Sequence, residues 1–397
     1  MDASLFLACE RGTAVSLKRE LARKGFADKQ TTTTPTTVVV HGCTKEELVR
    51  AAYTLQTPTR IGYLLGTANI TLDTEETVLA LETLIGSLDL HELLIQDKTF
   101  LVVCDRDGNH EYNSVDLSQA AGRLLRRYAK EALPFVPDVD LKRPDILFHL
   151  HVDDDQAWFS LDLLGYDADK RHYKLFNNPH SIKGAAAACL LMAADWQPGM
   201  SLLDPFAGGG EIPIEAALFS TKRSPHYYEK KLACKHHPLF APLFAQVTER
   251  ADGAVAVLEQ GVISSYDAQL RNVSAAKKNA KIAGVDKSIS FSKLDVEWLD
   301  TKLQAGSIDR IVTLPVEASK HIPRDKALTL HKQLFYQADF VLHKQGTITF
   351  LCTKPEDLLL AAEHYGFAVV EQRQVFTGKL PRWVARFSKQ QSQTKSP

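Results

Sequence analysis

From residue 179 onward, short apolar stretches alternate with helical patterns of ten residues or more. The apolar stretches lie at residues 201–203, 261–265, 288–292, 308–313, 347–351, 367–372 and 383–387. Helical patterns lie between them at residues 210–220, 268–283, 327–342 and 355–365. Alternation of this kind predicts a parallel sheet with helices on both faces. We therefore predict an α/β, Rossmann-like domain over residues 179–388.

A glycine-rich turn follows the first of these predicted strands. Residues 204–217 read DPFAGGGEIPIEAA, so a strand ends in a carboxylate and a helix begins after three glycines. Glycine lets the backbone approach a ligand closely, and the free amides at a helix start attract an anion. Pro213 stands where the dinucleotide-binding spacing needs its third glycine, and the Gly-Lys-Ser/Thr of a phosphate-binding loop is absent. The sequence therefore disfavours a nicotinamide dehydrogenase.

Aspartates follow the ends of three successive predicted strands. They are Asp204, Asp267 and Asp295. In an open α/β sheet, ligands bind at the carboxyl ends of the strands, and an acidic residue there commonly binds ribose hydroxyls. The helix after Asp267 is predicted to stop at Gly284, because glycine commonly ends helices. We expect this edge of the sheet to bind a nucleotide.

The residues of this region resemble those of a known enzyme family. The stretch at 204–217, the segment NPHSIKGAAAACL at 178–190 and the segment at 267–285 are similar to class I S-adenosylmethionine-dependent methyltransferases, specifically the RNA guanine-N2 methyltransferase group. The resemblance implies that Asp204 orders the turn, Asp267 binds the cofactor ribose and Asp295 binds the adenine amino group. The implied cofactor-binding residues are Asp204, Phe206, Gly208, Gly209, Gly210, Glu211, Asp267, Ala268, Asp295 and Val296.

The sequence departs from this family in two places. After the fourth strand the family has Asn/Asp-Pro-Pro-aromatic, whose oxygens position the target amino group while the ring stacks on the base. The residues at these positions, which are the candidate catalytic residues, are Thr313, Leu314, Pro315 and Val316. In addition, Glu211 replaces the usual threonine. Its carboxylate either repels the methionine carboxylate of the cofactor or caps the helix N-terminus.

The first 165 residues alternate short strands and helices in an α+β pattern. Thr44 begins the sequence Thr-Lys-Glu-Glu, a capping box that predicts a helix start. The stretches DRDGNH at 105–110, SLDLLG at 160–165 and KRHY at 170–173 resemble a THUMP domain, which a ferredoxin-like domain normally precedes. The expected ranges are 1–90 for the ferredoxin-like domain, 91–165 for THUMP, 166–178 for a linker and 389–397 for a disordered tail.

A basic stripe in the THUMP-like region favours an RNA partner. Its members, spaced to share one face of a helix, are Arg123, Arg126, Arg127 and Lys130. Their spacing suits contacts with phosphates, although an ordinary solvated helix face is the alternative. The resemblance implies that this half of the chain captures the acceptor end of tRNA. Lys170 and Arg171 are further candidates for the same RNA surface.

Composition limits the other classes of protein. The 397 residues carry 47 Lys and Arg against 48 Asp and Glu, and a net charge of -1 disfavours binding of nucleic acid by bulk charge. No apolar run reaches the about 18 residues of a membrane span, and no signal-peptide pattern opens the chain. Six cysteines without CxxC spacing predict free thiols in the cytoplasm. The cluster from Cys234 to His237 lacks a second paired cluster, so we expect no metal site.

The sequence thus predicts an S-adenosylmethionine-dependent RNA methyltransferase that acts on guanine N2 in the tRNA acceptor stem. Ribosomal RNA is the alternative substrate. The competing interpretation is a non-catalytic THUMP-type RNA-binding protein, either a scaffold or the partner of an active subunit. The Thr-Leu-Pro-Val sequence at 313–316 favours that interpretation, because it lacks the base-clamping residues of the family.

Overall fold

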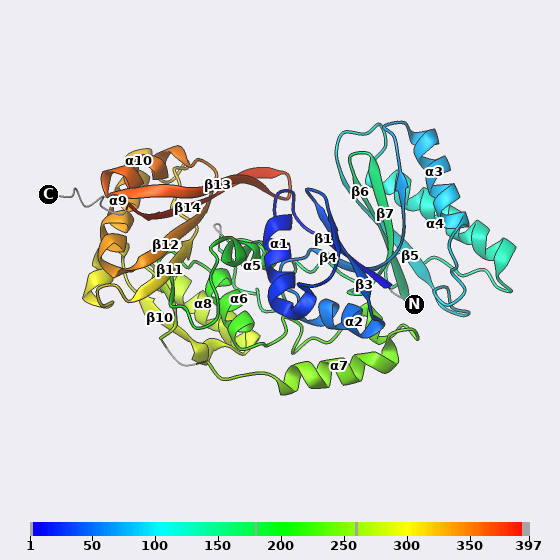
Figure 1. Cartoon of the computed structure of the whole chain (residues 1–397), viewed down its shortest axis with the longest axis horizontal. Coiled ribbons are helices and arrows are strands. Elements are labelled where there is room, and N and C mark those ends of the chain that lie inside the picture. Colours follow the sequence, from blue (N-terminus) through cyan, green and yellow to red (C-terminus); the bar gives the residue numbers. More distant parts are fainter. Residues whose placement is uncertain (1–2, 179–180, 259–260, 391–397) are drawn as a thin grey trace. The chain divides into compact units, whose positions relative to one another are not determined.

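The computed structural model describes residues 3–178, 181–258 and 261–390. These residues form two compact units (Figure 1). Unit 1 comprises Met1–Cys9, Leu21–Ala168 and Glu229–Gly253, and unit 2 comprises Glu10–Glu20, Asp169–Tyr228 and Ala254–Pro397. Neither unit is one uninterrupted stretch of the chain, so each is completed by a segment distant in sequence.

Unit 1 is built on a seven-stranded sheet. Its strands lie in the order β2 (Thr31–Thr33), β3 (Thr37–Cys43), β1 (Ala3–Ala8), β4 (Arg60–Asn69), β7 (Gln156–Asp162), β6 (Ile146–Asp153) and β5 (Phe100–Asp107). Neighbouring strands are antiparallel except β5 and β6, which are parallel. A single sheet therefore carries the strands of both regions that the sequence assigned to separate α+β domains.

Helices in unit 1 pack their apolar faces on this sheet or on one another. They are α2 (Lys45–Thr54), α3 (Thr74–Gly86), α4 (Ser114–Ala132) and α7 (Ala241–Gly253), with a π-helical turn at Ala22–Phe26 and a 3-10 turn at Ala233–Lys235. The capping box predicted at Thr44 is confirmed, since its hydroxyl accepts from the Glu47 amide while the Glu47 carboxylate accepts from the Thr44 amide. Each bond gives an acceptor to a backbone N–H at the helix start that has none within the helix.

The insertion around Cys234 is packed into unit 1 and leads into a helix. Cys234 and His237 are buried, and α7 follows them. Phe244, Val247 and Thr248 are spaced at helical intervals and are buried, so α7 has an apolar stripe of its own. The sequence pattern did not predict this helix.

Unit 2 contains the predicted Rossmann-like sheet. Its strands lie in the order β10 (Ile289–Lys293), β9 (Ile263–Asp267), β8 (Leu202–Asp204), β11 (Ile308–Thr313), β12 (Leu342–Cys352), β14 (Leu380–Lys389) and β13 (Phe367–Thr377). The first five strands are parallel, as predicted, but β14 runs antiparallel to both of its neighbours. β13 and β14 follow each other through a tight turn, and such a hairpin can only pair antiparallel.

Helices cover both faces of this sheet. They are α5 (Gly184–Ala193), α6 (Glu211–Ser220) and α8 (Leu270–Ala283) on one face, and α9 (Arg324–Val341) and α10 (Glu356–His364) on the other, as Figure 1 shows. Alternate strand residues enter two separate cores, so Leu202 and Val312 pack with the first set of helices and Leu203 and Ile311 with the second. The predicted C-terminal glycine of α8 is confirmed, because Gly284 adopts a left-handed conformation there.

The N-terminal helix α1 (Ala14–Leu21) belongs largely to unit 2. The segment before it approaches the β13–β14 hairpin, where the Phe376 amide donates to the Arg11 carbonyl at 2.9 Å. Arg373 donates to the Ser16 hydroxyl at 2.9 Å, and Arg19 donates to the Met192 carbonyl at the end of α5. The methyl of an alanine at Gly12 would lie 2.7 Å from the Gln374 carbonyl oxygen, so only glycine fits this approach.

Two expected segments behave differently in the structure. Tyr173 and Arg171 are buried in unit 2, which corrects the expectation that residues 166–178 are merely a polar linker. At the other end of the chain β14 continues to Lys389, so strand structure extends into the expected tail, whose residues 391–397 lie outside the described part. Among the described residues, no helix has the length and apolar character required to span a membrane.

Candidate cofactor and substrate site

The strand order of unit 2 changes direction between β8 and β11. The chain builds outward from β8 through β9 to β10 and then returns to the other side of β8 with β11. Such a switch point opens a crevice at the carboxyl ends of the strands. Asp204 ends β8 and Thr313 ends β11, so both residues lie at this point.

The glycine turn after β8 requires glycine at two positions for steric reasons. Gly208 and Gly210 have φ angles of +52° and +83°, in the left-handed region. A Cβ on Gly208 would lie 2.7 Å from the side-chain nitrogen of Asn178, and one on Gly210 would lie 2.8 Å from the Ala276 methyl. Helix α6 begins directly after Gly210, so its open amides face the turn.

Asp204 is buried beneath this turn. Its Oδ1 accepts from the Thr313 hydroxyl at 2.6 Å and from the Phe206 amide at 3.2 Å. Burial raises the pKa of Asp204 to about 7, and the two hydrogen bonds oppose that rise. The contact with the Phe206 amide fits the predicted role of Asp204 in ordering the turn.

Asp267 connects the end of β9 to the glycine turn. Its Oδ2 accepts from the Gly208 amide at 3.1 Å, and its Oδ1 accepts from the Gln269 amide at 2.8 Å. The Asn272 side chain donates to the same Oδ1 at 3.1 Å. Two neighbouring strands therefore hold one turn through a single carboxylate, while Ala268 beside it is exposed.

Asp295 follows β10 at the same edge of the sheet. The parallel register pairs Lys293 with Asp267, so Asp295 lies two residues beyond that pair. Its side chain is half-buried at the start of a short 3-10 segment, Val296–Thr301, whose first residue is buried in the core. Asp204 and Asp267 thus end neighbouring strands, and Asp295 lies just beyond the end of the third.

Glu211 is the first residue of α6 and its carboxylate is buried. It accepts from the Ser181 hydroxyl, and Lys174 Nζ lies 3.6 Å from the same oxygen. Burial raises the pKa of Glu211, which the contacts with Ser181 and Lys174 oppose. Its Oε1 would be 2.7 Å from a Cβ on Gly209, so the carboxylate lies against the glycine turn.

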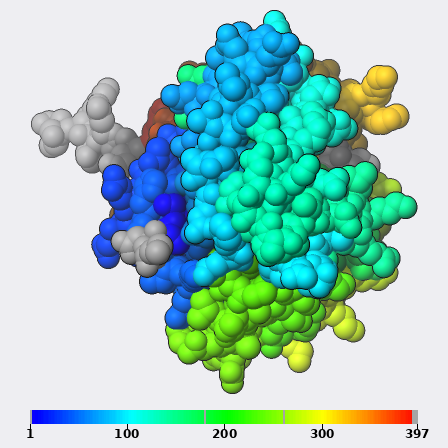
Figure 2. Space-filling view, turned by 90° about the vertical axis from the view of Figure 1, so that its right-hand side faces the viewer, coloured from blue at the N-terminus to red at the C-terminus, as the bar shows by residue number. Residues whose placement is uncertain are grey.

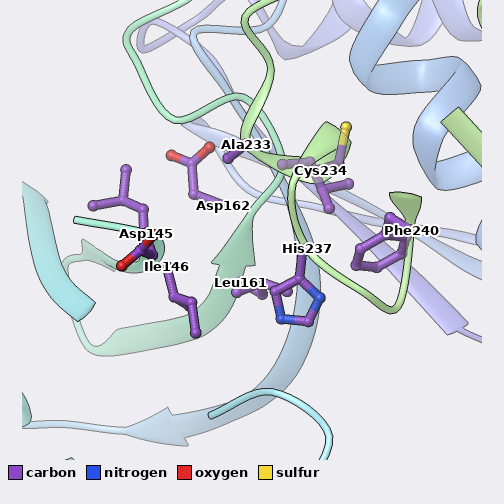
Figure 3. Close-up of a pocket in the computed structure, with 10 residues that line it drawn as sticks. Asp145, Ile146, Leu161, Asp162, Ala233, Cys234, His237 and Phe240 are labelled. Carbon is purple, nitrogen blue, oxygen red and sulfur yellow. The ribbon is translucent and has the colours of Figure 1, made fainter. Parts of the chain in front are cut away.

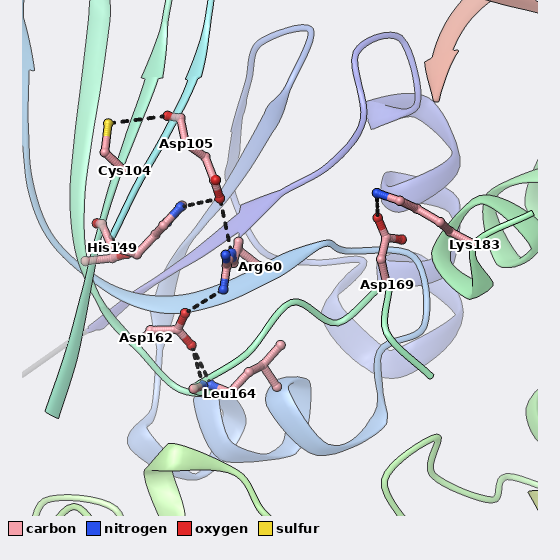
Figure 4. Close-up of polar contacts among 10 residues, drawn as sticks. Arg60, Cys104, Asp105, His149, Asp162, Leu164, Asp169 and Lys183 are labelled. Atoms are coloured by element: carbon pink, nitrogen blue, oxygen red, sulfur yellow. Dashed lines mark hydrogen bonds and ion pairs between the residues drawn. The ribbon is translucent and has the colours of Figure 1, made fainter. Parts of the chain in front are cut away.

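A strap formed by residues 169–178 and 181–183 crosses this region of unit 2. Asn279, buried in α8, donates to the carbonyls of Phe176 and Gly209 at 3.0 and 2.9 Å, and its oxygen accepts from the Phe176 amide. Lys183 contacts Asp169 at 2.8 Å, as Figure 4 shows. Through Asn279 the strap and the glycine turn are fixed to one helix. Sequence analysis missed this role, for which the only signal is an amide in an otherwise apolar helix face.

A buried ion pair anchors the strap. Arg171 Nε donates to Glu215 Oε1 at 2.8 Å, a second guanidinium nitrogen donates to Oε2 at 3.2 Å, and the Tyr173 hydroxyl donates to Oε1 at 2.7 Å. The side chains of Arg171 and Glu215 are 1% and 0% exposed. The prediction that Arg171 contacts RNA is therefore corrected, because no phosphate can reach its guanidinium. Neighbouring Lys170 is exposed.

The basic stripe on α4 lies on the surface of unit 1. Its four cationic residues are exposed, while Leu117, Ala121 and Leu125 on the other face are buried. Figure 2 shows α3 and α4, in light blue to turquoise, at the surface of this unit. Arg127 pairs with Glu82 of α3 at 2.5 Å, which neutralises part of the stripe. Arg123, Arg126 and Lys130 form no ion pair with a described residue.

Comparison with known proteins identifies both regions. A family model described as "RMKL-like, methyltransferase domain" matches residues 171–382, more than half of the chain. The chain belongs to the RMKL-like methyltransferase family. A THUMP domain model matches residues 75–162, which include α3, β5, α4, β6 and β7.

Solved structures share the fold of this methyltransferase over almost its whole length. SMU.472, in complex with SAH, is 19% identical with a TM-score of 0.79, and 99% of each chain is covered. TrmN from Thermus thermophilus is 22% identical with a TM-score of 0.70, covering 98% of this chain and 100% of its own. A predicted N6-adenine-specific DNA methylase from Listeria monocytogenes str. 4b F2365 is 19% identical with a TM-score of 0.79, covering 98% and 97%.

The residues after β11 differ from the expected base clamp. Thr313 is fully buried and its hydroxyl donates to Asp204, which corrects the expectation that its oxygen faces a target base. Leu314 packs on the core and Pro315 is buried. The Val316 carbonyl accepts from His331 Nε2 at 2.9 Å. The Thr313 hydroxyl proton is therefore directed at Asp204, and the Val316 carbonyl already accepts one hydrogen bond.

The THUMP motif at 160–165 has a structural explanation. Asp162 Oδ1 accepts from the Leu164 and Gly165 amides at 2.7 and 2.8 Å, which holds the turn where Gly165 has a φ of +82°. Arg60 bridges Asp162 and Asp105 at 3.6 and 3.1 Å, and His149 also contacts Asp105 (Figure 4). This network ties β4, β5, β6 and β7 of unit 1 together.

A small pocket in unit 1 contains the Cys234 cluster. Asp162, Cys234, His237 and Phe240 line it together with Asp145, as Figure 3 shows. Burial raises the pKa of Cys234 to about 12, so the thiolate that metals bind is disfavoured. His237 contacts the Leu93 carbonyl at 3.3 Å instead. Within the described ranges, no group of three or more His, Cys, Asp or Glu side chains could hold a metal ion.

Proposed function

We propose that this chain is an S-adenosylmethionine-dependent RNA methyltransferase that methylates guanine N2 in the acceptor stem of tRNA. The observation that carries the proposal is the Asp267 carboxylate, which joins the glycine turn after β8 to the end of β9. Membership of a methyltransferase family supports the reaction class, and the THUMP match supports an RNA substrate. The SAH held by the structurally similar SMU.472 supports the cofactor.

The residues at the strand ends fit an adenosine group. A carboxylate has about four acceptor sites, so Asp267 can receive one ribose hydroxyl in addition to its three N–H donors. Asp295 is half-buried and would accept from the adenine amino group. The left-handed turn at 208–210 would receive the methionine portion, with its backbone amides directed at the ligand. When bound, the cofactor supplies a methyl group on a positively charged sulfur.

Glu211 would set the charge balance at the methionine end. Its carboxylate lies beside Gly209, where the cofactor's own carboxylate would approach, and like charges repel. Lys174, 3.6 Å away, offsets this charge. We therefore propose that the Glu211–Lys174 pair has no net charge, so that the cofactor carboxylate is not repelled when it binds beside it.

The chain's contribution to methyl transfer would be to orient the target amino group. The exocyclic nitrogen must direct its lone pair at the methyl group, which hydrogen-bond acceptors on the protein favour. The Thr313 hydroxyl directs its proton at Asp204 and offers only a neutral hydroxyl acceptor, and Val316 has no ring to stack on the base. We propose that transfer is slow for this reason.

The same observation favours a second function. The Thr313 hydroxyl donates inward to Asp204 instead of facing a base. This favours a non-catalytic RNA-binding protein, or the partner of an active subunit. Under this alternative the site still binds the cofactor or RNA, but no methylated nucleoside is formed. The two proposals therefore differ in whether a methylated nucleoside is formed, which can be measured.

Mass spectrometry of RNA nucleosides separates the proposals. Total tRNA and ribosomal RNA would be compared between cells with and without this protein, and purified chain would be incubated with unmodified tRNA. Loss of N2-methylguanosine from tRNA, restored by the purified chain, supports the first proposal. A change only in ribosomal RNA assigns the alternative substrate. RNA binding without any new methylated nucleoside supports the non-catalytic function.

Replacing Asp267 with alanine should lower affinity for S-adenosylmethionine by about 10- to 100-fold. One hydrogen bond from a ribose hydroxyl to a charged acceptor is lost, and such a bond contributes about 1.5–3 kcal/mol. Isothermal titration calorimetry measures the change, with Asp325→Ala on exposed α9 as the matched control. Equal affinity in wild type and Asp267→Ala, or no binding to wild type, would refute the cofactor assignment.

Removing charge from Arg126 and Arg127 together should weaken binding of every tRNA sequence to a similar extent. Contacts with phosphates release counterions, so the slope of log affinity against log salt should fall by about 1 to 2. Because Arg127 already pairs with Glu82, we expect the slope to fall by about 1 rather than 2. Filter binding at several salt concentrations provides the measurement. An unchanged slope would identify the stripe as an ordinary solvated face.

A further inference from the structure

The exposed face of α8 in unit 2 carries positive charge without any acidic side chain. Arg271, Lys277, Lys278 and Lys281 are all exposed, while Ala276, Asn279, Ala280 and Ala283 are buried on the opposite face. The helix contains four cationic residues and no Asp or Glu, although the whole chain has a net charge of -1. The nearest acidic residue after the helix is Asp286. Such a one-sided distribution attracts a polyanion.

Two aromatic side chains flank this face at fixed positions. The Phe176 ring is 39% exposed, and both its backbone N–H and its carbonyl are bonded to Asn279 of α8. Lys278 Nζ lies 4.9 Å from the centre of that ring. The ring is therefore held rigidly beside the basic residues while one side stays open to solvent.

Tyr228 provides the second ring, at the C-terminal end of the helix. It is 56% exposed and packs against Gly284, where any side chain would collide with it. Arg223 donates to the Tyr228 hydroxyl at 3.1 Å and lies 4.5 Å from the centre of the Tyr227 ring. Six residues separate Lys278 from Gly284, which is about 9 Å along a helix. Lys281 lies between these two points.

We propose that this face, formed by Phe176, Lys278, Lys281 and Tyr228, binds a single-stranded segment of the substrate RNA. Proteins that hold single strands combine a basic track for phosphates with aromatic rings on which bases stack. The spacing of the two rings leaves room for phosphate contacts at Lys281 between two stacked bases. The proposal rests on the proposed function for the RNA substrate, but it concerns a surface that the cofactor site does not use.

The test compares charge and aromatic variants of the full chain. Lys278→Ala with Lys281→Ala should lower affinity for unmodified tRNA and for oligouridine about 10-fold at moderate salt. It should also reduce the salt slope by about 1.4, since each single-strand phosphate contact contributes about 0.7. Phe176→Leu and Tyr228→Leu should each lower affinity on the order of 10-fold with an unchanged salt slope, because a stacked base is lost and no charge.

Lys326→Ala with Lys332→Ala on α9 is the matched control, because both lysines are exposed and the charge change is identical. Calorimetry with S-adenosylmethionine is run in parallel. Variants of the α8 face that bind RNA like the control, while wild type binds both ligands, overturn this inference and leave the proposed function intact. A wild type that binds no RNA overturns both. Loss of binding to phosphatidylserine vesicles without loss of RNA affinity also overturns it and assigns the face to a lipid surface.

Discussion

Replacing Arg171 with methionine should lower the free energy of unfolding of unit 2 by about 3–5 kcal/mol, because it leaves the Glu215 carboxylate buried without its cation. Glu215 is fully buried and accepts from two guanidinium nitrogens and from the Tyr173 hydroxyl. Removing only the guanidinium abolishes two of these bonds and the compensating charge. Urea denaturation measures the loss, and hydrogen exchange should localise it to α5 and α6.

Two further variants make this result interpretable. Lys170→Met changes the exposed neighbour and should alter stability by less than about 0.5 kcal/mol. The double change Arg171→Met with Glu215→Leu removes both charges and should recover much of the loss, although the Tyr173 hydroxyl then lacks its acceptor. A loss below about 1 kcal/mol in the single variant would mean that the pair does not anchor the strap.

Arg171 illustrates the limit of sequence reasoning for this chain. In the sequence it stands beside Lys170 in a polar segment and looks like a surface cation. Its partner Glu215 is 44 residues away, in a helix that was predicted for a different reason. The absence of a side chain at Gly184, which leaves room for Arg171, is equally invisible without the fold. Long-range pairs of this kind require the tertiary structure.

Features that depend on local chemistry were predictable. The capping box at Thr44 and the C-terminal glycine Gly284 are each fixed by residues within one turn of helix. The aspartates at the strand ends follow from strand–helix alternation, because parallel strands end at one edge. The completion of each unit by a segment distant in sequence was not predictable in this way. The contacts of residues 10–20 with β13 connect parts of the chain about as far apart as its length allows.

Thr313 shows the same limit within the site itself. The sequence identified its position after the fourth strand, but not the direction of its hydroxyl, which donates to Asp204 109 residues earlier. That bond satisfies a carboxyl whose pKa burial raises to about 7. Thr313→Val, which keeps the shape and removes the donor, should therefore cost about 1–3 kcal/mol of stability. This cost would explain why the position holds a hydroxyl whether or not a base is ever bound.

Restoring the family motif, with Thr313→Asn, Leu314→Pro and Val316→Tyr together, should raise single-turnover methylation of unmodified tRNA on the order of 10²-fold. An asparagine amide can still donate to Asp204, as the threonine hydroxyl does, while its carbonyl oxygen becomes an acceptor for the target amino group. The new tyrosine ring supplies the stacking surface that valine lacks. Affinity for S-adenosylmethionine should not change, because Asp267 and the glycine turn are untouched.

The outcome of the triple change decides between the two proposed functions. A scaffold without a base pocket would gain nothing from it, because orienting one amino group has no effect when the base is not bound beside it. Thr313→Val serves as the control, since it removes the hydroxyl without providing an acceptor and should not raise the rate. A fully active wild type that the triple change impairs would contradict both forecasts, slow transfer by the enzyme and no transfer by a scaffold. The acceptor for the target amino group would then have to come from residues outside 313–316, on the carboxyl edge of the same sheet.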